Sequence, residues 1–271
     1  MRKSNTNWRK KIKFNRSKFS VLIIVLVLFF WVNFNFSQGN VIKEQNKLIK
    51  NFRSANKFFK KGEKQFYKKN FEKAEKNLMK CIEIFPNYSN AYFYLSKGYY
   101  HNGNLKGALD YIVKAKSTYK DFVTIVDTTA RKNLDELRKS MKDLSSESIY
   151  VANDGDKHQV RDAKSQTLQK MNDWQKNHKK SVIALKNIRA DFSYFHGNIY
   201  FKLKKFQEAL NEYVEAIKIN PKHKQAYNNL ISLLYMAKQY KKASEYLKLA
   251  ESNKINVNPK LKDAVNKAVS Q

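Results

Sequence analysis

The sequence predicts an all-α fold in which helical hairpins stack as repeats, and two observations support this prediction. The first is a fixed period: Ala74 and Ala108 are 34 residues apart, and so are Ala209 and Ala243. Each alanine follows a large apolar residue by three positions, and such a recurring unit is typical of repeat proteins. The second is composition, because only 7 Gly and 3 Pro occur in 271 residues, too few for the many turns of a β-sandwich or barrel.

Residues 1–18 form a basic segment with eight Lys or Arg residues and no acidic residue. Residues 19–37 follow, and they contain the apolar run VLIIVLVLFFWV, with Trp31 near its end. A helix of about 18 residues is about 27 Å long, which is close to the thickness of a bilayer core, and Trp is enriched at membrane interfaces. We therefore predict a transmembrane helix or signal anchor over residues 19–37.

The charge asymmetry around this segment predicts its orientation. Basic residues flank the cytoplasmic end of a membrane helix, so residues 1–18 are expected in the cytoplasm. The bulk of the chain is then extracytoplasmic, in the periplasm or cell envelope. A cleaved signal peptide has the same asymmetry and is the alternative, since cleavage would release the rest of the chain as a secreted protein.

Four repeat units fit the period. An extended helix leads into the first two over residues 40–122, and the other two occupy residues 190–257. In the second helix of each unit, large and small residues alternate at steps of three, four and three. Such steps keep the side chains on one helix face, and the small residues let two helix axes approach closely. The units and these residues are 55–88 (Phe71, Ala74, Leu78, Cys81), 89–122 (Leu105, Ala108, Ile112, Ala115), 190–223 (Phe206, Ala209, Tyr213, Ala216) and 224–257 (Tyr240, Ala243, Leu247, Ala250).

This pattern resembles the tetratricopeptide repeat (TPR) family, whose unit is a pair of antiparallel helices. The first helices match the family less closely than the second helices do. Gly62 and Gly197 occupy its small position, but Ser96 and Ile231 stand there in the other two units. The resemblance implies an all-α fold with two pairs of TPR-type hairpin repeats. It also implies a scaffold or adaptor that binds protein or peptide partners.

Residues 123–189 do not follow the repeat pattern. We expect a helix at their start, a loop near 145–157 where SSES and VANDGDK occur, and then a long amphipathic helix that runs into the third unit. Two interpretations remain open. Ala108 and Ala209 are 101 residues apart, one short of three periods, which favours a degenerate repeat with an elongated helix. Alternatively, the segment is a long-helix insert that separates the two pairs.

Residues 258–271 are predicted to form a capping helix. Pro259 stands where a helix begins, and Leu261, Val265 and Ala268 form an apolar stripe. A terminal repeat needs such a cover because its outer face has no neighbouring unit.

In TPR proteins, set positions of the first helices line a concave groove, and the resemblance carries these positions over to this chain. Most of the side chains at these positions are aromatic, and exposed aromatic residues in a cleft are typical anchors for a peptide or a helix. The alternative is that the long central helix folds back and fills the groove. The predicted groove residues are Phe59, Phe66, Tyr67, Phe93, Lys97, Tyr100, Tyr194, Asn198, Phe201, Asn228 and Tyr235, with Glu63, His101 and Met236 beside them.

Some members of the family hold a C-terminal carboxylate with Lys, Arg and a pair of Asn residues. Asn198 and Asn229 match the Asn pair in repeat position, but Tyr194 stands where the first Lys is expected. The resemblance therefore implies peptide binding without assigning this specificity.

The formal net charge of +31 raises an alternative function, a basic helical surface that binds anionic polymer or lipid headgroups. Nucleic acid is not the expected partner. Of the 54 basic residues 46 are Lys and only eight are Arg, the residue whose planar fork recognises phosphate and base edges.

No catalytic or metal-binding motif occurs in the sequence. The five His residues are isolated, no Gly-rich phosphate loop is present, and Cys81 occupies a small-residue position of a repeat. We therefore expect no enzyme activity, no metal and no cofactor. The predicted function is a membrane-tethered protein–protein interaction scaffold in cell-envelope assembly or organisation.

Overall fold

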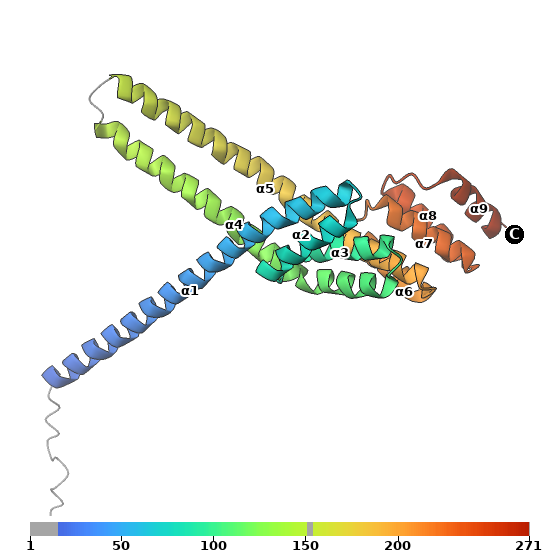
Figure 1. Ribbon diagram of the computed structural model, residues 1–271, viewed down its shortest axis with the longest axis horizontal. Coiled ribbons are helices and arrows are strands. Elements are labelled where there is room, and N and C mark those ends of the chain that lie inside the picture. Colours follow the sequence, from blue (N-terminus) through green and yellow to red (C-terminus); the bar gives the residue numbers. More distant parts are fainter. Residues whose placement is uncertain (1–15, 151–153, 271) are drawn as a thin grey trace, which may run out of the picture. The chain divides into compact units, whose positions relative to one another are not determined.

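The fold is known from a computed structural model in which every regular element of the described residues is a helix (Figure 1). The predicted all-α fold is therefore confirmed for this part of the chain. The chain divides into two compact bodies, residues 1–48 and 49–271. The structure describes the backbone of residues 16–150 and 154–270, and the side chains of residues 42–146 and 157–270 apart from 179, 181 and 182.

Helix α1 (Arg16–Tyr67) contains the predicted membrane segment, residues 19–37, whose side chains lie outside the described set. Where the structure describes the chain, none of the helices combines the length and the apolar character that crossing a membrane requires. From Ile49 onwards, α1 belongs to the second body and provides the first helix of the first repeat unit.

The turn inside each repeat unit has the same geometry in all four units. Lys69, Gly103, Lys204 and Lys238 have positive φ angles of 59°, 76°, 61° and 56°. In every turn this residue and the next donate their N–H groups to carbonyls of the preceding helix, which ends the helix as an αL cap does. The remaining helices are α2 (Phe71–Ile84), α3 (Ser89–His101), α4 (Leu105–Tyr150), α5 (Asp154–Lys202), α6 (Phe206–Ile219), α7 (Lys224–Met236), α8 (Tyr240–Ser252) and α9 (Pro259–Val269).

The small residues of the repeat pattern lie where two helices cross closely. Ala108 and Ala209 are fully buried, as the pattern predicts. On a facing helix, a Cβ atom added to Gly197 would lie only 2.6 Å from Cε1 of Tyr213. Glycine at this position therefore allows the ring of α6 to rest directly on the backbone of α5.

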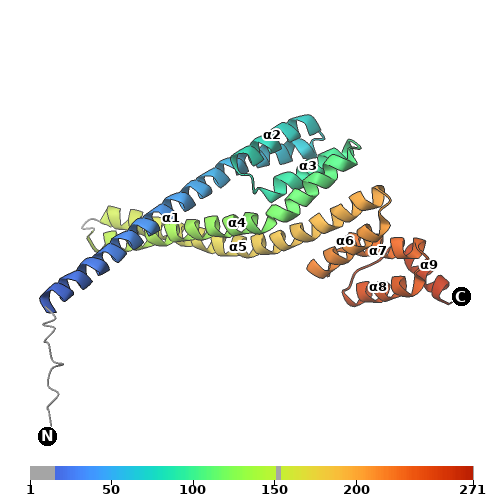
Figure 2. The ribbon, with the colours of Figure 1, turned by 90° about the horizontal axis from the view of Figure 1, so that it is seen from below.

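Helices α4 and α5 are 46 and 49 residues long, whereas the helices of ordinary length in the array have 13 or 14 residues. Their added lengths run side by side in both views (Figures 1 and 2). The Tyr119 hydroxyl donates to the Leu185 carbonyl at 2.8 Å, and Trp174 Nε1 donates to the Ala130 carbonyl at 2.9 Å. We name residues 119–189 the long hairpin.

The long hairpin interrupts the repeats in the sequence but not in space. Ile112 and Ala115 of α4 share one buried cluster with Phe192 and Ile199 of α5. The third unit therefore stacks directly on the second, and no further helical pair of the described chain lies between them. This packing favours an insert over a degenerate repeat for residues 123–189.

The connection at the tip of the long hairpin is shorter than the loop predicted near 145–157. Helix α4 continues to Tyr150 and α5 begins at Asp154, and the residues that join them lie outside the described part. The hydroxyls of Ser145 and Ser146 donate to carbonyls one turn earlier in α4, at 2.8 and 2.9 Å. These bonds give the serine hydroxyls acceptors within the helix. The serine-rich stretch is therefore compatible with α4 and does not end it.

Helix α9 covers the end of the array. The side chain of its N-cap residue, Asn258, accepts a hydrogen bond from the N–H of Lys260 at 3.0 Å, and Pro259 occupies the first turn. Val265 is fully buried in the core cluster formed by α6, α7 and α8. The last repeat thus has an apolar neighbour on its outer side.

Candidate docking groove

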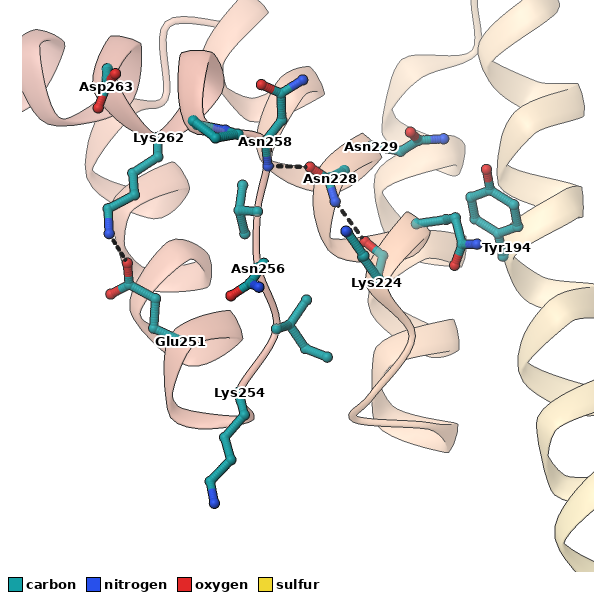
Figure 3. Close-up of a pocket in the computed structure, with 14 residues that line it drawn as sticks. Tyr194, Lys224, Asn228, Asn229, Glu251, Lys254, Asn256, Asn258, Lys262 and Asp263 are labelled. Carbon is teal, nitrogen blue, oxygen red and sulfur yellow. Dashed lines mark hydrogen bonds and ion pairs between the residues drawn. The ribbon is translucent and has the colours of Figure 1, made fainter.

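Two neighbouring cavities lie along the first helices of the third and fourth units. The first, between α5 and α7, has a volume of about 330 Å³ and is also bordered by Tyr100 of α3. The second, between α7, α9 and the segment before α9, has a volume of about 1140 Å³ (Figure 3). Tyr194 and Asn229 line both cavities, so the two form one groove, which we call the docking groove.

A hydrogen-bonded network of three side chains lies where the two cavities meet. Asn198 Oδ1 accepts from the Tyr213 hydroxyl at 2.9 Å and from Asn229 Nδ2 at 2.9 Å. The Tyr213 ring is fully buried against Gly197, and burial raises the pKa of its hydroxyl to about 12. The hydroxyl therefore remains a neutral donor around neutral pH, and the network holds both amides in place.

This network leaves one donor and one acceptor unused. Asn198 Nδ2 and Asn229 Oδ1 have no hydrogen-bond partner among the described residues. A side-chain amide donor and acceptor held beside each other complement the N–H and C=O groups of an extended peptide. The two unused atoms can therefore bond to a peptide backbone.

Apolar side chains flank the network. Phe201 is 37% exposed and packs on Phe206, with ring centroids 5.7 Å apart, and Met236 is 63% exposed. Tyr194 lies between the cavities, with its ring 4.9 Å from that of His223. Large apolar residues beside a few fixed polar groups are the usual lining of a binding site.

The cavity between α7 and α9 is more polar, and hydrogen bonds tie its walls together. The Asn258 N–H donates to Asn228 Oδ1 at 2.9 Å, and Lys262 Nζ lies 2.6 Å from Glu251 Oε1 (Figure 3). Each contact joins α9, or the residue before it, to the fourth unit. The capping helix therefore also forms one wall of the docking groove.

Some of the predicted groove residues do lie together. Tyr100, Tyr194, Asn198 and Phe201 line the cavity between α5 and α7, although they come from two helices that are far apart in the sequence. Asn228 lines the neighbouring cavity. These five residues outline the part of the predicted surface that is open.

Phe59 and Phe66 do not line a groove, which corrects the prediction. Each is only 8% exposed and belongs to the core cluster of α1, α2 and α3. Phe59 stacks on Tyr88 at 4.9 Å, and Phe66 packs edge-on against Tyr94 at 5.2 Å. Phe59 and Phe66 thus pack on neighbouring aromatic rings and are not available to a ligand.

Lys97 and Phe93 are also engaged inside the array. Lys97 Nζ lies 5.4 Å from the ring of Phe66 and 5.2 Å from that of Phe93, and burial lowers the pKa of this lysine. Phe93 in turn packs on Phe192 of α5, with ring centroids 4.8 Å apart. Helix α5 therefore covers part of the surface predicted on α3, but it does so as the first helix of the next unit and not by folding back.

Tyr67 and Tyr235 lie outside the docking groove. Tyr67 is 70% exposed, and its hydroxyl is 2.9 Å from that of Tyr94. Tyr235 is partly buried, and its ring lies 5.4 Å from that of Tyr240. Neither residue borders the two cavities that form the groove.

The repeat pattern places Tyr213 only in the core, whereas in the structure Tyr213 also lines the groove. One sequence signal points to this role, because the other three units have Leu78, Ile112 and Leu247 at the same position. A buried tyrosine in an aliphatic position needs a partner for its hydroxyl. In the cavity between α5 and α7, the other lining residues that repeat positions did not indicate are Lys202, Ser232 and Leu233.

The groove provides hydrogen bonds and apolar contacts. Within the described residues, no three His, Cys, Asp or Glu side chains gather as a metal site requires. Cys81 is fully buried in the first unit, and burial raises the pKa of its thiol to about 12, so the thiolate is scarce at neutral pH. The arrangement is that of a binding surface.

Stacked helical hairpins with an open groove along their first helices define a helical repeat scaffold. The comparisons with known proteins agree with this class: a model of the TPR repeat matches residues 197–236, and a model of the tetratricopeptide repeat matches residues 55–88. Residues 55–88 and 197–236 therefore match tetratricopeptide repeats. TPR domains generally mediate protein–protein interactions.

Among curated proteins, the chain is 38% identical over 78 residues to the Hsp70-Hsp90 organising protein of Plasmodium falciparum (isolate 3D7). The matched stretch is 29% of this chain and 14% of that protein, so the chain spans about one seventh of its relative's length. Solved structures are also similar to this chain, and the next two are among them. The pilF protein of Pseudomonas aeruginosa is 16% identical, with 80% of this chain and 90% of that chain covered and a TM-score of 0.34. The TPR2AB domain of yeast Sti1, solved as a pHSP90 complex, is 17% identical, with 81% and 99% covered and a TM-score of 0.26.

Proposed function

We propose that the docking groove binds an extended segment of a partner protein. The observation that carries this proposal is the network of Asn198, Tyr213 and Asn229, which holds an unused amide donor and acceptor in fixed positions. Exposed Phe201 and Met236 stand on either side to take apolar side chains of the segment. Fixed backbone contacts give register, and the apolar contacts give affinity.

The carboxylate-clamp specificity of some TPR proteins is not part of this proposal. Tyr194 replaces the first lysine of that clamp, and its ring packs on His223. The name of the P. falciparum relative refers to Hsp70 and Hsp90. For this chain, we propose only an extended peptide with apolar side chains.

We further propose that residues 19–37 tether the array to a membrane, with residues 1–18 in the cytoplasm and the array outside it. What supports this step is the apolar run beside eight basic residues and the interfacial position of Trp31. The scaffold would then serve in assembling or organising the cell envelope. Mass spectrometry of the mature N-terminus tests the tether, because a chain that starts near residue 40 would be a cleaved and secreted form.

The groove is tested by selecting displayed random peptides on the full chain and measuring their affinity for variants. Phe201→Ala should weaken a selected peptide about tenfold or more, because it removes an apolar wall of the site. The matched control is Leu249→Ala, which truncates a residue that is 42% exposed and outside the groove. Equal affinity for the Phe201→Ala variant and the wild type would remove the groove from the proposal.

Binding of anionic polymer or lipid headgroups by the basic surface is the competing function, and the net charge of +31 favours it. Salt separates the two functions. Counterion release makes polyanion binding fall steeply between about 50 and 200 mM salt, whereas docking of an apolar peptide changes little. A steep salt dependence that the Phe201→Ala variant leaves unaltered would favour the basic surface.

A further inference from the structure

A second large cavity lies at the base of the long hairpin, where residues 119–133 of α4 and 174–189 of α5 meet the end of α6. Its volume is about 1020 Å³, and it shares no lining residue with the docking groove. Most of its wall comes from residues 123–189, outside the four repeat units. The insert therefore builds a surface that the repeats alone do not have, and we call it the hairpin cleft.

The floor of the hairpin cleft is apolar. Val126 and Ala130 of α4, Leu185 of α5 and Ile219 of α6 all line it. The nearby Thr128 donates its hydroxyl to a carbonyl one turn earlier in α4, at 2.8 Å. Its hydrogen-bonding need is met inside the helix, so the cleft does not require a polar ligand at this point.

Trp174 forms a rigid wall of the cleft. Its indole Nε1 donates to the Ala130 carbonyl at 2.9 Å, and its ring stacks on that of His178 at 4.7 Å with an angle of 7° between the planes. These two contacts fix an indole that remains partly exposed. Tryptophans held in this way are frequent at the centres of protein interfaces.

The charges around the cleft are unbalanced. Lys186 and Arg189 of α5 and Lys218 of α6 line it, and none of them forms an ion pair with a described carboxylate. The lining contains two carboxylates, Asp127 and Glu215.

Asp127 is already occupied, because Arg131 Nε lies 2.7 Å and His178 Nε2 lies 3.8 Å from its oxygens. Glu215 is therefore the one lining carboxylate that has no ion pair among the described residues. The lining contains three cations against this one carboxylate. The surplus at the rim is positive, so the rim complements a partner that carries acidic side chains.

We propose that the hairpin cleft docks an acidic amphipathic helix of a partner protein. Residues 119–133 of α4 form a wall about 21 Å long at about 1.5 Å per residue, which matches about four turns of a bound helix. The apolar face of that helix would pack on Trp174 and the floor, and its flanking acids would meet Lys186, Arg189 and Lys218. This is the helix-in-groove mode of recognition, with the charges selecting the partner.

The test uses the full chain and two synthetic peptides of about 15 residues with leucines at helical spacing. One peptide carries glutamates beside the leucines and the other carries lysines at the same positions. The acidic peptide should bind at least about tenfold more tightly than the basic one. The combined variant Lys186→Glu, Arg189→Glu and Lys218→Glu should reverse this preference.

The matched control reverses three lysines of the docking groove, Lys202→Glu, Lys224→Glu and Lys254→Glu. It changes the net charge equally and should keep the preference for the acidic peptide. If both triple variants reverse the preference, the selectivity belongs to the overall charge and the proposal is overturned. Equal binding of the two peptides to the wild type also overturns it.

A second measurement does not depend on the folding of the triple variant. Cys81 is the only cysteine and is buried, so a cysteine introduced by Lys186→Cys can be labelled selectively with a fluorophore. The acidic peptide should change the emission of this label and leave unchanged a label introduced by Lys202→Cys in the docking groove. No change at position 186 with saturating peptide would refute docking in the hairpin cleft.

Discussion

The two pairs of repeat units use the same positions for different purposes. In the first pair, Phe59 is buried, and in the second pair the residue at the same position, Tyr194, borders the docking groove. Glu63 accepts a hydrogen bond from the Tyr94 hydroxyl at 2.7 Å, whereas the amide N–H groups of its counterpart Asn198 have no acceptor among the described residues. At these two positions the first pair is closed by packed side chains, and the second pair is open.

The composition of the crossing helices explains this difference. In the first pair, aromatic rings surround the first helices and pack on one another, as the contact of Phe52 with Tyr88 at 5.6 Å illustrates. Such ring clusters are favourable and exclude ligands. In the second pair, the position of Tyr88 is taken by His223, which lies 3.1 Å from Asp191 Oδ1, and the position of Phe52 is taken by the polar Asn187. The repeat position thus sets where a residue lies on its helix. The side chains packed around it determine whether it is exposed or buried.

The largest predicted effect tests how tightly the second pair is packed. Gly197→Ala should destabilise the protein by about 2 kcal/mol, because the new Cβ meets the Tyr213 ring and that ring is held by hydrogen bonds. Gly62→Ala in the first pair should also destabilise the protein, because the new Cβ meets Cγ of the buried Leu78 at 2.8 Å and the Ala74 carbonyl at 3.2 Å. Thermal unfolding measures both changes.

The control for this pair is Gly98→Ala. No atom lies within 4 Å of a Cβ at that position, so the substitution should stabilise α3 by up to about 1 kcal/mol. Destabilisation by Gly98→Ala equal to that by Gly197→Ala would mean that close packing is not the cause.

The junction between the two pairs depends on Glu212 of α6. Its oxygens lie 2.7 Å from Lys116 Nζ and 2.8 Å from His196 Nδ1. Burial alone would raise the pKa of Glu212, but the bonds from His196 and Lys116 outweigh it and lower this pKa below 4.5. Glu212→Gln should therefore cost about 1.5 kcal/mol at neutral pH.

The sign of this pKa shift sets the pH dependence. Because the folded pKa is lower than the unfolded one, the contribution of Glu212 is complete above about pH 4.5 and is lost as the pH falls through the folded pKa. Urea unfolding at several pH values measures this. The unfolding free energies of the wild type and the Glu212→Gln variant should become equal in acid. Glu208→Gln on the same helix is the control, and a gap that stays constant in acid would contradict the prediction.

A smaller effect separates stability from binding. Tyr213→Phe removes the hydroxyl that donates to Asn198 Oδ1. The variant should lose about 1 kcal/mol of unfolding free energy and should also bind a groove peptide more weakly. Tyr227→Phe removes one of the two acceptors of Asn253 Nδ2, a hydrogen bond of 3.1 Å that lies away from the groove. It should cost similar stability and leave the affinity unchanged. Loss of affinity in both variants would show that stability alone controls binding.

The smallest effect concerns the turns, which are alike in both pairs. Lys204 has a φ of 61°, a conformation that glycine adopts without strain, so Lys204→Gly should stabilise the protein by about 0.5 kcal/mol. Lys202→Gly, inside the last turn of α5, should destabilise it by about 1 kcal/mol. Chemical denaturation distinguishes these opposite signs.

Much of the fold follows from local sequence patterns. The buried positions of Ala108 and Ala209 and the covering helix at Pro259 could be predicted because period and helix caps act over a few residues. The docking groove could be predicted only in part. Tyr194 and Asn198 are open, but the burial of Phe66 depends on rings from other helices, which no single-helix pattern contains.

The hairpin cleft could not be predicted from the sequence, because it too depends on contacts between different helices. Asp127 and His178 are neighbours in the structure but 51 residues apart in the sequence, and their meeting depends on the register of two long helices. That register is set by contacts such as the one from Trp174 to Ala130. Amphipathic periodicity gives the face of each helix without giving its alignment along the partner.

The docking role of the open pair is tested most directly by a double-mutant cycle on Asn198 and Asn229 with a peptide selected on the full chain. Each single change to alanine should weaken the peptide about tenfold, and the double change should cost little more, because the two amides act as one unit. The Asn211→Ala variant on α6 serves as the control. Unchanged affinity in both single variants would contradict the assignment of the groove as the peptide site.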